Sequence, residues 1–131
     1  HRSEPNYIGS LKIEAPIVAL APDASNEICL EGAVICIESA DPGYDWIFTR
    51  NIAGLVTRYG GTNSHMAIRC AEYGLPAAIG CGEQLFSQVC SAKSIVLDCG
   101  SKAISINFEE AFTNAMRLNE IALPKNLSAQ R

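Results

Sequence analysis

Residues 54–82 read GLVTRYGGTNSHMAIRCAEYGLPAAIGCG, and the order of elements predicted in this segment indicates the fold class. The segment begins within an apolar strand that is predicted over 53–57. Two adjacent glycines follow this strand at positions 60 and 61. Three residues that commonly cap helices follow at 62–64, so a helix is predicted over 65–73. A glycine and a proline then end this helix, and a second short strand is predicted over 77–79. This order of strand, helix and strand indicates an α/β fold.

The rest of the chain continues the alternation. Further strands are predicted over 16–20, 33–37, 94–97 and 103–106. Further helices are predicted over 44–50, 83–90 and 108–121, the first capped by Asp41 and the last amphipathic. The strand at 33–37 has no polar alternation, which predicts burial on both faces. On the helix over 65–73, Ile68 and Ala71 are expected to face inward.

Composition limits the function classes. The 131 residues include 10 basic and 14 acidic side chains, a net charge of −4, and 48% are hydrophobic. The size predicts one domain and the apolar content argues against disorder. The acidic balance argues against nucleic-acid binding, and no apolar run approaches the ~20 residues of a membrane helix. The chain begins with His1 rather than Met, so we expect a piece of a longer protein. No signal peptide is recognised and the cysteines are interpreted as reduced, so we expect a cytoplasmic location.

The expected domain organisation is a linker or lead-in segment over 1–12, one domain over 13–123, and a C-terminal tail over 124–131. The six cysteines include no CxxC pair, and His1 and His65 are the two histidines, so a zinc site is not favoured. Six reduced thiols are the favoured interpretation, with a disulfide framework as the alternative.

His65 is the candidate reactive residue because it lies in the first turn of a predicted helix. Free N–H groups and the helix dipole favour anions there and disfavour a charged imidazolium. A neutral imidazole is a competent nucleophile, and a phosphorylated ring would carry close to two negative charges. The helix end would stabilise that product by roughly 0.3–1 kcal/mol. Gly60 and Gly61 leave room for a bulky phosphate donor.

The pattern around His65 resembles a known family. Its members share two glycines, a small residue before the histidine, an aliphatic pair, and a later Glu-x-Gly-[Ile/Leu]-Pro-Ala. The positions that agree in register are Gly60, Gly61, Ser64, His65, Ala67, Ile68, Glu72, Gly74, Leu75, Pro76, Ala77 and Gly80. The chain therefore resembles the phosphohistidine (swivelling, mobile) domain of the phosphoenolpyruvate-utilising enzymes, closest to the phosphoenolpyruvate synthase-like and rifampicin phosphotransferase-like members.

The resemblance implies a compact three-layer β/β/α swivelling domain in the α/β class. It implies that His65 accepts a phosphoryl group from ATP or phosphoenolpyruvate at an ATP-grasp nucleotide-binding domain and passes it to a small-molecule acceptor at a second site. ATP and Mg²⁺ are expected in the parent protein, no cofactor or metal is expected in this domain, and the isolated domain is expected to be inert. The alternative is a non-catalytic swivelling or interaction module with an idle histidine. A Cys–His hydrolase is less favoured, because Cys70 lies five residues beyond His65 and points elsewhere on the helix.

Several neighbours are candidates to support the phosphate. The residues assigned to this role are Gly60, Gly61, Thr62, Asn63, Ser64 and Arg69. The family usually has an arginine where this chain has Ala71, and Arg69 lies four residues past His65 on the same helix face. Arg69 is expected to contact the phosphoryl group, with a solvated arginine as the alternative. Asp41 and Asp45 precede the motif, and either carboxylate could orient the imidazole, although a solvated or capping role is favoured.

Overall fold

The computed structural model describes residues 4–22, 24, 27–39 and 41–108. Seven strands lie in this part of the chain, in the order β1 (Asn6–Ile8), β2 (Lys12–Ala19), β3 (Val34–Ile37), β4 (Gly54–Thr57), β5 (Ala77–Ile79), β6 (Ser94–Asp98) and β7 (Ala103–Asn107). Its helices are a 3-10 helix, η1 (Pro42–Thr49), and two α-helices, α1 (His65–Tyr73) and α2 (Gly82–Cys90). None of these helices has the length and apolar character that crossing a membrane requires.

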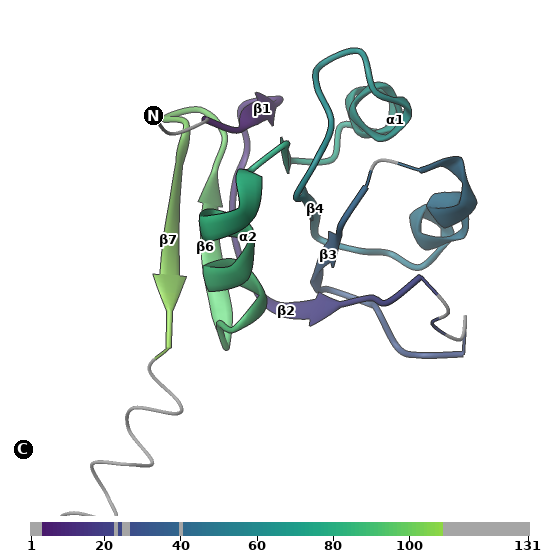
Figure 1. The fold of residues 1–131 in the computed structure, drawn as a ribbon, viewed down its shortest axis with the longest axis horizontal. Coiled ribbons are helices and arrows are strands. Elements are labelled where there is room, and N and C mark those ends of the chain that lie inside the picture. Colours follow the sequence, from purple (N-terminus) through teal and green to yellow (C-terminus); the bar gives the residue numbers. More distant parts are fainter. Residues whose placement is uncertain (1–3, 23, 25–26, 40, 109–131) are drawn as a thin grey trace, which may run out of the picture.

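The strands form one mixed sheet in the order β1-β5-β4-β3-β2-β6-β7. Strands β2 to β5 are parallel to their neighbours within the centre of the sheet, while β1, β6 and β7 pair antiparallel. Strand β2 belongs to both halves, because residues 12–16 pair with β6 and residues 17–19 pair with β3. The sheet curls at β2, so that β6 and β7 turn away from β3 and β4 (Figure 1). This is the α/β class that the sequence predicts.

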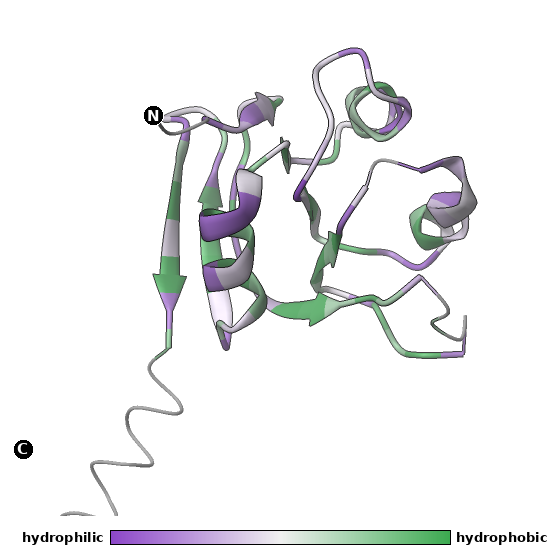
Figure 2. Cartoon of the chain, in the orientation of Figure 1, coloured by the Kyte–Doolittle hydropathy of each residue, from purple (hydrophilic) through white to green (hydrophobic). Residues whose placement is uncertain are grey.

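Two apolar clusters pack on opposite faces of the central strands. Along β3, Ile35 and Ile37 join the cluster beneath η1 and α1, whereas Val34 and Cys36 join the cluster beneath α2 and β6. Figure 1 shows α1 and η1 on one side of β3 and β4, and α2 on the other. Apolar residues are concentrated on β2 and β3, as Figure 2 shows. The burial of every residue of β3 confirms the interpretation drawn from its lack of alternation.

The structure differs from the predicted elements in several places, and β2 begins at Lys12 rather than at residue 16. The sequence predicts no element at residues 6–8, but these residues form β1 and pair with β5. On α1, Ile68 and Ala71 are exposed, so their inward placement was wrong. Met66, Ala67 and Cys70 are buried instead, in the apolar cluster on the face of the sheet where α1 contacts β1, β5 and η1. The helix predicted over 108–121 falls outside the described residues, apart from Phe108.

Candidate functional site

A buried hydroxyl group forms hydrogen bonds that fix the loop leading from β4 to α1. Thr57 is fully buried, and its Oγ1 donates to the Tyr59 carbonyl at 2.8 Å and accepts from the Gly80 amide at 2.9 Å. Gly80 has a φ of +75°, and a Cβ there would overlap the carbonyl oxygen of Gly60. The loop can therefore lie directly on the chain that follows β5 only because position 80 has no side chain.

Arg58 adds a second anchor beside this loop. Its guanidinium lies 3.0 Å from Glu38, which follows β3, and 3.5 Å from Glu83 in the first turn of α2. It also lies over the ring of Tyr59, 4.9 Å from its centroid. Arg58 thus ties the glycine loop to elements on both sides, and its charge is already paired with two carboxylates.

The start of α1 is fixed by Ser64, the last of the three predicted cap residues. Its Oγ donates to the Gly61 carbonyl at 2.7 Å and accepts from the Ala67 amide at 3.4 Å. Gly74 ends the helix in the left-handed conformation, with a φ of +67°. The loop positions at 60–63 are exposed. His65 is therefore the first residue of α1, at the end of an exposed turn, as the sequence predicts.

The His65 ring contacts a carboxylate from η1. Its Nε2 lies 2.7 Å from Oδ1 and 2.9 Å from Oδ2 of Asp45, and the two side chains are 37% and 39% exposed. An ionised carboxylate only accepts hydrogen bonds, so Nε2 carries the proton in this contact. In the neutral ring the unshared electron pair is then on Nδ1. Asp45 orients the imidazole and leaves part of its surface open.

The two acidic candidates before the motif have different roles. Asp41 caps η1, since its Oδ1 accepts from the Gly43 amide at 2.9 Å. Asp45, one turn further along η1, reaches His65 across a separation of 20 residues. The favoured capping role is thus confirmed for Asp41, whereas Asp45 lies against the His65 ring, as the less favoured orienting role requires.

Arg69 is engaged with side chains of η1 and of its own helix. Its guanidinium lies 3.2 Å from Glu72 and 2.8 Å from the Tyr73 hydroxyl. It also lies over the rings of Phe48 and Tyr73, which themselves stack with centroids 5.1 Å apart. These contacts join η1 to α1 beside the Asp45–His65 pair. The contact between Arg69 and a phosphoryl group stays a prediction.

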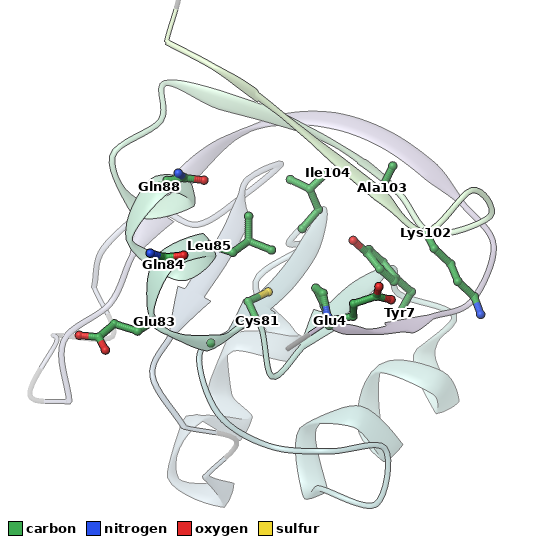
Figure 3. Close-up of a pocket in the computed structure, with 12 residues that line it drawn as sticks. Glu4, Tyr7, Cys81, Glu83, Gln84, Leu85, Gln88, Lys102, Ala103 and Ile104 are labelled. Atoms are coloured by element: carbon green, nitrogen blue, oxygen red, sulfur yellow. The ribbon is translucent and has the colours of Figure 1, made fainter. Parts of the chain in front are cut away.

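A separate pocket lies away from His65. It has a volume of about 710 Å³ and lies between β1, the start of α2 and β7 (Figure 3). Tyr7, Cys81 and Lys102 line it, and none of the predicted phosphate-site residues does. Burial raises the pKa of Cys81 to about 12, and burial also raises the pKa of Tyr7. The Cys81 thiol is therefore protonated near neutral pH and is a poor nucleophile.

Comparison with known proteins adds a family match over the same region. A family model described as "PEP-utilising enzyme, mobile domain" matches residues 29–102, more than half of the chain. A rifampicin phosphotransferase of Bacillus cereus is 36% identical over 72 residues, and a phosphoenolpyruvate synthase of Neisseria meningitidis serogroup B is 39% identical over 66 residues. These matches cover 55% and 50% of this chain, but only 8% of either relative. A rifampicin phosphotransferase of Bacillus subtilis is 35% identical over 72 residues, again 8% of its length.

Proposed function

This chain belongs to the family of mobile domains of phosphoenolpyruvate-utilising enzymes, and we propose that it is the phosphocarrier domain of a larger phosphotransferase. In this proposal, His65 accepts a phosphoryl group from ATP or phosphoenolpyruvate at a nucleotide-binding domain of the same protein. It then delivers that group to a small-molecule acceptor at a second site. The final acceptor is recognised by domains outside this chain.

The position of His65 carries the proposal. The ring is partly exposed at the N-terminus of a nine-residue α-helix, and Asp45 holds it from one side. The free N–H groups of the first turn and the helix dipole favour the anionic phosphohistidine by roughly 0.3–1 kcal/mol. The names of the relatives, rifampicin phosphotransferase and phosphoenolpyruvate synthase, support phosphoryl transfer as the shared chemistry.

The remaining requirements of the reaction belong to the partner domain. Phosphoryl transfer depends on in-line positioning and on neutralisation of phosphate charge. An ATP-grasp domain with bound Mg²⁺ and ATP would supply both, and the acceptor imidazole is what this chain contributes. Arg58 and Arg69 are paired with carboxylates in the undocked domain. We propose that Arg69 turns toward the phosphoryl group when the domains dock, while Gly60 to Ser64 leave space for the donor.

The test uses the parent protein with ATP and Mg²⁺, and in parallel with phosphoenolpyruvate. Intact-mass analysis should show one added phosphoryl group that is labile in acid and stable in base. His65→Ala should abolish the addition and leave the protein folded, because the loss of one partly exposed hydrogen bond to Asp45 removes only a small part of the roughly 5–15 kcal/mol by which typical domains are stable. Gln88→Ala, an exposed change on α2, is the matched control and should label like the wild type.

Two outcomes would contradict the proposal. Equal labelling of the wild type and His65→Ala would place the acceptor elsewhere. No labelling of a folded, nucleotide-binding parent would favour an interaction module with an idle histidine. The isolated 131 residues should not label with ATP and Mg²⁺. Adding the nucleotide-binding domain as a separate chain should restore slow labelling of His65, because the millimolar effective concentration of a tether is lost.

A further inference from the structure

The contact between Asp45 and His65 has a consequence for the phosphorylated state. We propose that Asp45 is a positioning residue that favours loss of the phosphoryl group from phospho-His65, and so makes the carrier a stronger phosphoryl donor. The proposal rests on the phosphocarrier function of His65. It follows from the short distances of 2.7 and 2.9 Å between Nε2 and the two carboxylate oxygens.

Proton bookkeeping on the ring gives the first reason. A neutral imidazole has one N–H, and in this structure it points at Asp45. On phosphorylation, the P–O bond of the donor breaks and its electron pair leaves with the oxygen. A P–N bond forms, and the ring loses its N–H proton to solvent or to the leaving group. The neutral phosphorylated ring has no N–H left, whichever nitrogen bears the phosphorus. A ring phosphorylated on Nδ1 that still carries the Nε2 proton is a cation and would keep the contact, but once that proton has left, Asp45 loses its hydrogen bond in either case.

Charge gives the second reason, and it acts in the same direction. A phosphoryl group on a side chain carries about −1.5 to −2 charges at neutral pH. The small ring places these charges close to the Asp45 carboxylate, which already lies in contact with Nε2. Three arginines of the described residues lie on or beside these elements, and each has other contacts: Arg58 is bound to Glu38 and Glu83, Arg69 to Glu72, and Arg50 lies over the Trp46 ring. The helix N-terminus attracts the phosphoryl group, while Asp45 repels it.

Delivery of the phosphoryl group reverses both effects. The P–N bond breaks, a P–O bond forms on the acceptor hydroxyl, and the ring recovers a proton that the hydroxyl releases. With that proton on Nε2, the hydrogen bond to Asp45 forms again. Hydrogen bonds to charged groups are stronger than bonds between neutral groups, and the partial exposure of both side chains weakens this one. We therefore expect Asp45 to shift the equilibrium at least tenfold toward the free imidazole.

The experiment phosphorylates the 131-residue chain chemically with phosphoramidate, so that it needs neither the parent protein nor a nucleotide. At an alkaline pH, where the phosphorylated ring is neutral, and in excess ammonium, the reaction reaches an equilibrium between phosphoramidate and phosphohistidine, which ³¹P NMR measures. His65→Ala identifies the signal of His65 and separates it from that of His1. Asp45→Asn keeps the size of the side chain but removes its charge, and it should raise the equilibrium ratio of phospho-His65 to free His65 at least tenfold.

Asp41→Asn is the matched control. It removes one negative charge from the same helix, retains a good N-cap, and has no contact with His65, so its ratio should stay near the wild type. A ratio for Asp45→Asn that equals the wild type, that shifts toward free histidine, or that is matched by Asp41→Asn would overturn the proposal. ¹⁵N NMR of the ring is a second readout: a proton found on Nδ1 rather than Nε2 in the wild type would also refute it. Failure of the parent to label from ATP would contradict the carrier function without affecting these measurements.

Discussion

Replacing Gly80 by alanine should lower the unfolding free energy and displace the loop that leads to His65. Gly80 lies between β5 and α2, and its amide donates to the buried Thr57 hydroxyl at 2.9 Å. Its φ of +75° is one that alanine adopts at a cost of about 1–2 kcal/mol. The added methyl group would also overlap the Gly60 carbonyl oxygen, which is backbone and cannot rotate aside.

The two effects should add, because the loop at Gly60 must shift whatever φ the alanine adopts. Forcing extra atoms into a packed region costs about 1–3 kcal/mol. The expected loss in unfolding free energy is therefore about 2–5 kcal/mol, a large share of the 5–15 kcal/mol that typical domains possess. The displaced loop would also move the turn that leads to His65.

Urea unfolding, followed by circular dichroism, measures this loss. Gly61→Ala is the matched control in the same loop, since a Cβ there meets no atom within 4 Å and the residue has no positive φ. It should change stability by less than about 0.5 kcal/mol. If Gly80→Ala is as stable as Gly61→Ala, then the close approach of the two segments is not what holds the loop, and the reasoning fails.

Three further predictions concern stability. Thr57→Val should cost about 1–3 kcal/mol in urea unfolding, because two backbone groups lose the hydroxyl that bonds them, whereas Thr57→Ser should recover part of the loss. Arg69→Ala should lower the unfolding free energy by about 0.5–1 kcal/mol, because the guanidinium lies over two aromatic rings that join η1 to α1. Arg69→Lys should lower it by an intermediate amount. An unchanged unfolding free energy in Arg69→Ala would show that these contacts are too exposed to stabilise the fold. Burial raises the pKa of Cys70 and of Cys81 from 9.0 to about 12, so the folded state holds these protons more tightly than the unfolded state. The two protonated thiols contribute fully to the unfolding free energy below pH 9. Between pH 9 and 12 the unfolding free energy should fall by up to about 1.4 kcal/mol per pH unit for each thiol. The slope should be smaller in Cys70→Ala, which has lost one of the two thiols.

Local sequence signals identified the central elements because each signal has a short-range cause. The apolar run at β3 is buried on both faces of the sheet and needs no alternation. Ser64 and Gly74 mark the two ends of α1 through backbone contacts within a few residues. These features depend on conformational preferences and capping groups, which neighbouring residues determine.

Strand β1 could not be found in this way. It has three half-buried residues, and its hydrogen-bond partner β5 lies about 70 residues further along the chain. The face of α1 raised a similar difficulty: Met66 is fully buried and Ile68 is half exposed, although both are apolar. The rotation of a nine-residue helix about its own axis, and so the face that it buries, is determined by the sheet on which it packs. The amino-acid composition of the helix alone does not predict this rotation.

The pairing of Asp45 with His65 depends on long-range packing in the same way. Asp41 and Asp45 were equivalent candidates in the sequence, and a contact across 20 residues distinguishes them. Ile47, two residues after Asp45, and Met66, next to His65, are both fully buried in one apolar cluster. The core that joins η1 to α1 therefore also sets the distance between the carboxylate and the imidazole. Because core side chains are closely packed, this distance can be held firmly even though both polar groups are partly exposed to water.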